Sequence, residues 1–277
     1  MSKVQAIVII IATCGIILAS GMLLKTYKDY NSAETEYDDL NSQYTNTEGV
    51  SGFQLLIPET ETEEQVKELA RNFNREDFPE LEVDFEGLAE KNQDVVAWLY
   101  VGAVNISYPV VQGEDNEYYL HHTFEDKPNN SGAIFMDWEV KKNLSSWNTF
   151  IYGHNMKNGT MFGSLKKFIR EEGTYEKAPY IYVYIPGYIY RYKIFSYYLD
   201  PTDSKMYYTC DNLKEYRQYI ADALSKSVQD CQVPTSEEEN MLTLVTCSGA
   251  GSSKQRFFVH GEFIDRYVYE ASPNHSN

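Results

Sequence analysis

One cysteine stands where an apolar stretch gives way to a run of small polar residues. The segment TLVTCSGAGSSKQRFFVHG, residues 243–261, contains Cys247 and, nine residues later, Arg256. A thiol at the end of a rigid strand is well placed to act as a nucleophile, because its thiolate is the reactive form and a nearby guanidinium stabilises developing negative charge. The pattern predicts nucleophilic catalysis, provided that the chain also supplies an acid or base.

Histidine is the side chain best suited to that second task, and the chain has five. His154 follows the apolar stretch TFIY through Gly153, so it stands at a strand end like Cys247. His260 is the rival, on the same predicted strand as Arg256, but four residues of strand separate their backbones by about 13 Å, which is too far for one small reacting group. We therefore predict His154 as the acid–base residue. The others, His121, His122 and His275, lie in polar segments.

The remaining cysteines do not predict a metal site. Cys14, Cys210 and Cys231 show neither a CxxC motif nor a Cys/His spacing typical of zinc. Cys14 lies in an apolar segment and is a small apolar filler there. Cys210 and Cys231 flank a predicted helix and are either bonded or free. We favour free thiols, because neither lies in an obviously paired strand.

The segments between these candidates favour β-structure. The chain of 277 residues contains 24 tyrosines, and tyrosine suits strands with half-buried faces. Helices are predicted at residues 62–73, 85–92 and 212–225. Strands are predicted at 95–101, 105–112, 132–138, 148–153, 180–185, 188–199, 241–246 and 256–264. So many strands with few helices favour a β-barrel over alternating βαβ units.

The amino-terminal residues predict a membrane anchor. Residues 4–24 carry no charged side chain, and these 21 residues are long enough as a helix to span the hydrocarbon core of a bilayer. A cleaved signal peptide is the alternative, but its apolar region is normally only about 7 to 15 residues long. Lys3 on one side, and Lys25 with Lys28 on the other, leave the orientation open.

Charge is distributed unevenly along the rest of the chain. Residues 29–94 contain 19 acidic and 4 basic side chains, whereas the part from Val95 onward contains 22 and 17. No basic stripe is present, which argues against nucleic acid as a partner. We predict four segments: an anchor at 1–25, an acidic flexible stalk at 26–60, a catalytic domain with amino-terminal helices at 61–270, and a disordered tail at 271–277.

Taken together, the motifs resemble those of a known family. YGHNM around His154, TLVTC ending at Cys247 and the following Arg256 are similar to the active-site motifs of sortases, the cysteine transpeptidases of Gram-positive cell surfaces. Class B sortases are the nearer match, over about residues 84–264. The resemblance implies an eight-stranded sortase barrel with amino-terminal helices and one helix before the last two strands. It also implies a cytoplasmic amino terminus and an extracytoplasmic catalytic domain.

The resemblance implies the reaction as well. Cys247 attacks a threonine carbonyl in the carboxyl-terminal sorting signal of a surface protein and forms a thioester. His154 protonates the leaving amine, and Arg256 stabilises the oxyanion or positions the signal. The acceptor is an amine of a cell-wall peptide or a pilin lysine, and neither a metal nor an organic cofactor is needed. By the same resemblance, substrate contacts are expected at Asn116, Leu120 and Thr246.

Two other functions fit the same motifs. The first is a membrane-anchored cysteine endopeptidase, in which water hydrolyses the thioester. The second is a catalytically silent barrel that only binds the tails of surface proteins. Product analysis with an added amine distinguishes the first from a transpeptidase, and thiol labelling of Cys247 distinguishes the second.

Overall fold

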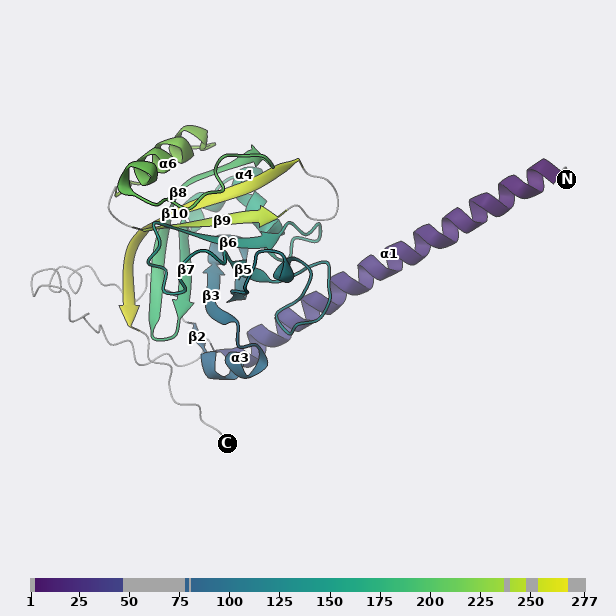
Figure 1. Cartoon of the computed structure of the whole chain (residues 1–277), viewed down its shortest axis with the longest axis horizontal. Helices are drawn as coiled ribbons and strands as arrows, with labels where there is room; N and C mark the ends of the chain where they lie inside the picture. The colour runs from purple at the N-terminus through teal and green to yellow at the C-terminus, as the bar shows by residue number, and fades with distance from the viewer. Residues whose placement is uncertain (1–2, 47–77, 80, 237–239, 248–253, 269–277) are drawn as a thin grey trace, which may run out of the picture.

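The protein is described here from a computed structural model, which covers residues 3–46, 78–79, 81–236, 240–247 and 254–268. Within these residues, eight strands form a closed barrel, and one long helix projects from its side (Figure 1). The barrel confirms the predicted fold class. The helix predicted at residues 62–73 lies outside the described residues.

The eight barrel strands coincide with the eight predicted from the sequence. They are β3 (Val95–Val101), β4 (Ile106–Val111), β5 (Ile134–Met136), β6 (Asn148–His154), β7 (Tyr180–Ile185), β8 (Tyr188–Pro201), β9 (Met241–Cys247) and β10 (Gln255–Val268). Around the barrel their order is β10-β8-β7-β3-β4-β5-β6-β9. Neighbours are antiparallel except for the parallel pairs β4–β5 and β6–β9. The parallel pair β6–β9 brings the carboxyl ends of two distant segments to one edge of the barrel.

Turn chemistry and strand alternation explain this architecture locally. The β7–β8 hairpin turns at Gly187, whose φ of 85° lies in the region that favours glycine. On β10, Phe257 and Val259 belong to the cluster that fills the barrel, whereas Phe258 and His260 face the opposite side. Successive side chains of a strand thus serve two separate cores.

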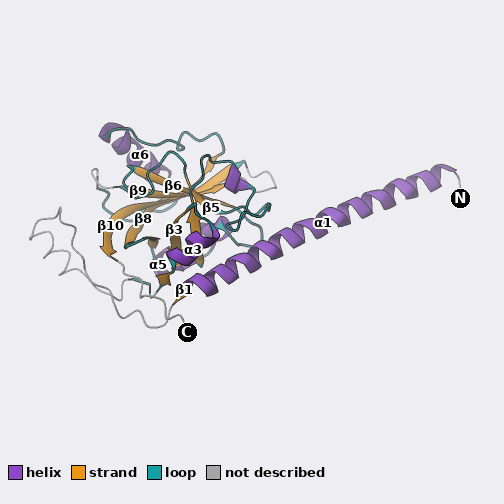
Figure 2. Cartoon of the chain, turned by 60° about the horizontal axis from the view of Figure 1, so that its bottom comes forward, coloured by secondary structure: helices purple, strands orange, loops and turns teal. Residues whose placement is uncertain are grey.

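The second core lies between the outer face of the barrel and helix α6 (Leu213–Lys226), which Figure 2 shows lying over strands β8, β9 and β10. Helix α6 begins after Asn212, whose side chain accepts a hydrogen bond from the Glu215 amide at 3.1 Å. It buries Tyr216, Tyr219, Ile220 and Ala223, which follow the spacing of one helical face. The helix predicted before the last two strands is therefore confirmed.

Shorter elements complete the fold. Helix α3 (Phe85–Lys91) begins after Asp84, whose carboxylate accepts a hydrogen bond from the Gly87 amide at 2.9 Å. The other elements are β1 (Thr45–Asn46), β2 (Glu82–Val83), η2 (Gly102–Val104), η3 (Tyr118–Leu120), η4 (Phe162–Lys166), α4 (Lys167–Arg170) and α5 (Thr174–Lys177). Strands β1 and β2 pair with each other and tie the end of the long helix to the start of the barrel domain.

The long helix α1 (Lys3–Tyr44) is continuous over 42 residues. Its first part is apolar and exposed, and is long enough to cross a membrane. Its last part packs on the barrel, where Ala33, Tyr37 and Leu40 are buried at the spacing of one helical face. The segment from residue 26, predicted to be a flexible stalk, is therefore helical through Tyr44. The prediction missed this because the acidic composition of the segment concealed a stripe of three apolar side chains. Residues 47–60 of that stalk lie outside the described residues.

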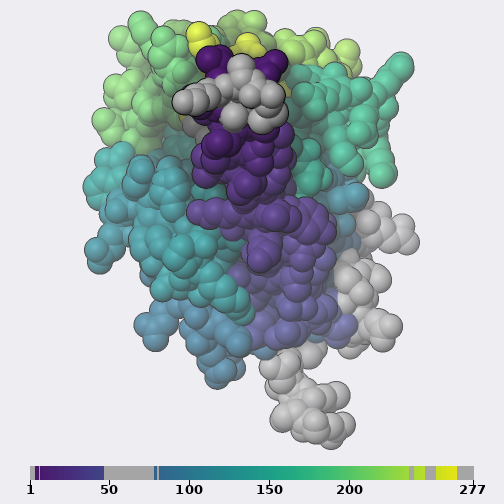
Figure 3. Space-filling model, turned by 90° about the vertical axis from the view of Figure 1, so that its right-hand side faces the viewer, coloured from purple at the N-terminus to yellow at the C-terminus, as the bar shows by residue number. Residues whose placement is uncertain are grey.

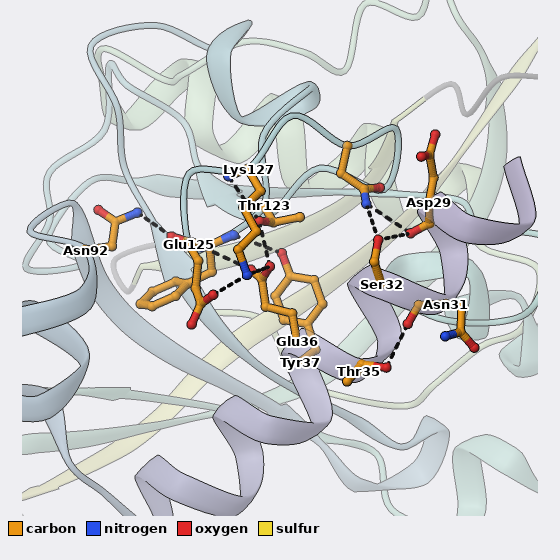
Figure 4. A network of polar contacts seen from close by, with 12 residues as sticks. Asp29, Asn31, Ser32, Thr35, Glu36, Tyr37, Asn92, Thr123, Glu125 and Lys127 are labelled. Carbon is orange, nitrogen blue, oxygen red and sulfur yellow. Dashed lines mark hydrogen bonds and ion pairs between the residues drawn. The ribbon is translucent and has the colours of Figure 1, made fainter. Parts of the chain in front are cut away.

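Polar contacts fix α1 to the loop that follows η3 (Figure 4). Tyr37 Oη donates a hydrogen bond to the Gly132 carbonyl at 2.8 Å. Glu36, only 7% exposed, accepts hydrogen bonds from Thr123 Oγ1 and from the Glu125 amide, each at 3.0 Å. Lys127 Nζ lies 3.4 Å from the same carboxylate. A buried charge with three such partners is stable, so this end of α1 belongs to the folded domain.

Candidate active site

The register of β6 and β9 brings the two principal candidates together. His154 and Cys247 are paired residues in the parallel ladder, and each is the last residue of its strand. Adjacent strands lie about 4.8 Å apart, so the two backbones are immediate neighbours. More than ninety residues of sequence separate them, and the parallel pairing of the two strands brings them together in space.

Strand β10 brings the third candidate to the same edge. Phe258 pairs with Val245 in the antiparallel ladder between β10 and β9. One step further, Thr246 Oγ1 accepts a hydrogen bond from the Phe257 amide at 2.9 Å. Continued by one more residue, this register sets Arg256 opposite Cys247.

His154 has one engaged and one free ring nitrogen. The side chain is 6% exposed, and Nε2 lies 2.8 Å from the Leu120 carbonyl oxygen. Because a carbonyl can only accept, this contact makes Nε2 the N–H donor and leaves Nδ1 as the basic nitrogen of the neutral ring. Nδ1 is buried and has no hydrogen-bond partner among the described residues. Nδ1 is therefore the atom available to exchange a proton.

Electrostatics make His154 a stronger acid than a free histidine. Burial lowers its pKa, the hydrogen bond to Leu120 partly offsets this, and the charges of His121 and Arg256 lower the pKa further. The influence of Arg256 shows that its positive charge lies near the imidazole. An imidazolium held here gives up its proton readily.

Arg256 presents an uncommitted donor. The residue is half-buried, and its Nη1 is buried without a hydrogen-bond partner in the described part of the chain. A buried guanidinium N–H left unpaired is costly, so it favours an acceptor such as a carbonyl oxygen or an oxyanion. The structure thus places an unpartnered imidazole nitrogen and an unpartnered cationic donor near the edge where Cys247 ends β9.

The three residues expected to contact substrate also make internal contacts. The Leu120 carbonyl orients His154, and Thr246 bonds the β10 backbone. Asn116 Nδ2 donates to Asp137 Oδ2 at 3.0 Å, and Asn116 Oδ1 accepts from the Trp138 amide at 3.1 Å. Leu120 and Thr246 adjoin the site directly, whereas Asn116 stands beside the turn after β5.

Two supporting residues were missed by the sequence analysis. Gly132 has φ of 57°, and a Cβ built there would lie 2.5 Å from the Tyr119 carbonyl oxygen and 3.0 Å from Cδ2 of His154. Glycine therefore allows the loop to pack against the imidazole of His154. Tyr37 of α1 donates a hydrogen bond to the carbonyl of the same glycine. The only sequence signal was a glycine before an apolar strand, which is too common to be informative.

His260 is not part of this cluster. It is fully buried beneath α6, with Nδ1 3.0 Å from Thr243 Oγ1 and Nε2 3.0 Å from Tyr198 Oη. Burial lowers its pKa to about 3, so the ring is neutral at ordinary pH. His121 is exposed and His122 is partly exposed, and the His122 ring stacks on Tyr118.

The other thiols are poor nucleophile candidates. Cys210 and Cys231 are both free, as favoured from the sequence. Burial raises the pKa of Cys210 to about 12 and also raises that of Cys231, so both stay protonated at neutral pH. Among the described residues, no group of three or more His, Cys, Asp or Glu side chains is arranged to hold a metal ion.

Comparisons with known proteins identify the family of this chain. Residues 99–264 match the Sortase domain family. Sortase B of Listeria monocytogenes is 31% identical over 192 residues, which cover 68% of this chain and 76% of that protein. The crystal structure of Clostridium perfringens sortase B aligns with a TM-score of 0.61 at 34% identity, covering 66% of this chain and 100% of that one.

A substrate complex of Staphylococcus aureus sortase B aligns over more of the chain. Its TM-score is 0.66 at 25% identity, with 86% of this chain and 99% of that chain covered. The family match spans both His154 and Arg256 as well as Cys247. The chain therefore belongs to the sortase family, and the relatives that it resembles are sortase B enzymes.

Proposed function

We propose that this protein is a membrane-anchored class B sortase that cleaves a carboxyl-terminal sorting signal after threonine and transfers the surface protein to an amine. The observation that carries the proposal is the pairing of His154 with Cys247 at the end of two parallel strands, with Arg256 on the adjoining strand. Membership of the sortase family makes cysteine transpeptidation the expected chemistry.

The acylation step assigns one task to each residue. The Cys247 thiolate attacks the threonine carbonyl carbon, and the resulting oxyanion is stabilised by the guanidinium of Arg256. When the C–N bond breaks, the proton on Nδ1 of imidazolium His154 passes to the departing amine. The product is a thioester between the surface protein and Cys247.

Transfer reverses these roles. An incoming primary amine attacks the thioester carbonyl and gives a proton to Nδ1 of His154, which restores the imidazolium. Collapse of the tetrahedral intermediate forms the new amide and releases the Cys247 thiolate. The lowered pKa of His154 suits the first half of the cycle, because a stronger acid protonates a poor leaving group more effectively.

Asn116, Leu120 and Thr246 are proposed to border the groove for the sorting signal. The contacts of Leu120 and Thr246 next to His154 and Cys247 support this assignment. For Asn116, the support is its bond to the backbone of Trp138, whose side chain is 51% exposed and could cover an extended peptide.

The proposed topology follows from α1. Its apolar part is proposed to cross the cell membrane with the amino terminus in the cytoplasm and the barrel outside. Protease added to intact cells should then remove the domain from Val95 onward. Protection of that domain on intact cells would reverse the orientation.

Mass spectrometry of a peptide reaction tests the enzymatic proposal. The protein is incubated with a library of sorting-signal peptides, with and without primary amines. We expect an acyl adduct on the peptide that contains Cys247, and its loss in Cys247→Ala. Hydrolysed product alone, even with amine in excess, would indicate an endopeptidase. A labelled thiol at Cys247 without any acyl adduct would indicate a silent binding protein, and adducts on Cys210 or Cys231 would refute the assignment of the nucleophile.

A further inference from the structure

A cavity of about 840 Å³ lies where α1 leaves the barrel. Leu23, Thr26 and Tyr30 of α1 line one side, and the segment after β6 with η4 and α4 lines the other. Four cationic side chains contribute to the lining, and Glu171 is the one carboxylate among the described lining residues. The cations are Lys157, Lys166, Lys167 and Arg170.

These four cations lack a neutralising carboxylate partner among the described residues. None of them has an ion-pair partner within the part of the chain that the structure describes. The pKa of Lys166 is lowered by burial and by the nearby charge of Arg170, which shows that like charges are held close together. In a chain of net charge −17, such a group attracts an anionic partner.

A buried hydroxyl points to the same kind of partner. Ser164 lines this cavity and is 6% exposed. Its Oγ is buried and has no hydrogen-bond partner among the described residues. An unpartnered hydroxyl in the lining of a cationic cavity is a suitable donor to a phosphate oxygen, and each such bond to an anion is stronger than a neutral one.

The position of the cavity along α1 identifies the source of the anion. Leu23 is the second-last residue of the charge-free segment 4–24. With that segment in the bilayer, Leu23 and Thr26 stand where hydrocarbon gives way to headgroups. Figure 3 views the molecule from the side on which α1 projects and shows this helix passing in front of the domain. The cavity beside α1 is thus at the level of the phospholipid phosphates.

We propose that this cavity binds the phosphate headgroups of anionic phospholipids and docks the barrel on the membrane surface. The inference rests on the proposed membrane insertion of α1. Asn155 and Met156, which directly follow His154, line the same cavity. Docking there fixes the distance between the active-site edge and the bilayer, because α1 is continuous and its far end is packed on the barrel.

Hydrogen exchange of the full chain in nanodiscs tests this inference. One set of discs contains phosphatidylcholine alone, and the other contains phosphatidylglycerol as well. We expect backbone amides of Phe162–Arg170 to exchange roughly fivefold more slowly with phosphatidylglycerol, as attraction through even one cation suffices for such a factor. The triple variant Lys166→Gln/Lys167→Gln/Arg170→Gln should exchange alike in both discs.

A matched triple variant controls for net charge. Lys141→Gln/Lys142→Gln/Lys205→Gln removes three exposed cations outside the cavity and should keep the difference between the discs. Equal exchange of the unmodified protein in both discs would overturn the inference. So would equal protection by inorganic phosphate in phosphatidylcholine discs, because the site would then bind a soluble anion. Amides of residues 4–24 report separately on insertion: if they exchange freely in both discs, the anchor proposal fails instead.

Discussion

His154 and His260 occupy neighbouring parts of one sheet and yet have different surroundings. His260 lies in the middle of β10 beneath α6, and hydroxyl groups of Thr243 and Tyr198 engage both of its nitrogens. His154 ends β6, where one nitrogen meets a carbonyl and the other has no partner among the described residues. The comparison teaches that a strand end leaves a ring nitrogen free for chemistry, whereas the middle of a strand under a helix uses both nitrogens for packing.

Removing each ring in turn gives the largest expected difference. His154→Ala should slow single-turnover acylation by roughly 10²- to 10⁴-fold, because the leaving amine then departs without a proton donor. His260→Ala should keep the acylation rate of whatever fraction remains folded. Circular dichroism establishes that fraction. If folded His260→Ala were inactive while folded His154→Ala kept a near-normal rate, His260 rather than His154 would be the acid–base residue.

Substitution of Arg256 tests whether the reaction needs the planar geometry of a guanidinium or only a positive charge. Arg256→Lys keeps the positive charge but loses the planar fork of donors, so transition-state stabilisation should fall by about 2 to 4 kcal/mol. The measurement is kcat/KM with a sorting-signal peptide. Arg266→Lys, on the distant part of β10, is the matched control and should leave kcat/KM unchanged. A loss of less than about threefold in Arg256→Lys would mean that charge alone suffices.

The buried ring of His260 should make stability depend on pH. Its folded pKa is about 3, below the ordinary value of 6.5, so the unfolded chain takes up a proton first as the pH falls. This histidine therefore lowers the free energy of unfolding progressively below pH 6.5 and has no effect above it. We expect about 2 kcal/mol of loss by about pH 5, measured by urea unfolding.

Two variants separate this effect from the other histidines. His260→Gln should remove most of the slope between pH 6.5 and about pH 5, whatever its effect on absolute stability. His154 has a pKa lowered in the same direction, so His154→Gln should remove a further part. An unchanged slope in His260→Gln would show that its ring is not buried neutral.

Tyr37→Phe is expected to have the smallest effect. It removes the hydrogen bond from α1 to the Gly132 carbonyl, beside the His154 ring, and should lower the free energy of unfolding by about 1 kcal/mol. Thr35→Ala is the control on the same helix, because the Thr35 hydroxyl donates to the Asn31 carbonyl of α1 itself. Equal stability of the two variants would mean that α1 contributes little to the wall around His154.

Much of the site could be predicted because strand ends are encoded locally. Alternating apolar residues marked β6 and β9, and the chemistry-bearing residues His154 and Cys247 followed them directly. The contacts of these residues could not be predicted in the same way. The Leu120 carbonyl that selects the tautomer of His154 lies 34 residues away in the sequence. Every residue has a backbone carbonyl, so no sequence pattern distinguishes this one. The docking of α1 was missed because its acidic side chains outnumber the three apolar ones that pack.

The sequence by itself determined the strands and the apolar helix, and it singled out Cys247 as the candidate nucleophile and His154 rather than His260 as the candidate acid–base residue, because these depend on side-chain type and on spacing along one segment. Only the tertiary structure decided that β6 and β9 run parallel in register, that Arg256 lies close enough to lower the His154 pKa, and that α1 packs against the loop beside the imidazole. The same holds for the cavity, which forms only because Leu23, Thr26 and Tyr30 of α1 lie opposite the cationic segment that follows β6. The physical reason is that such pairings are chosen by burial and hydrogen bonding summed over distant segments, which no short stretch of sequence specifies.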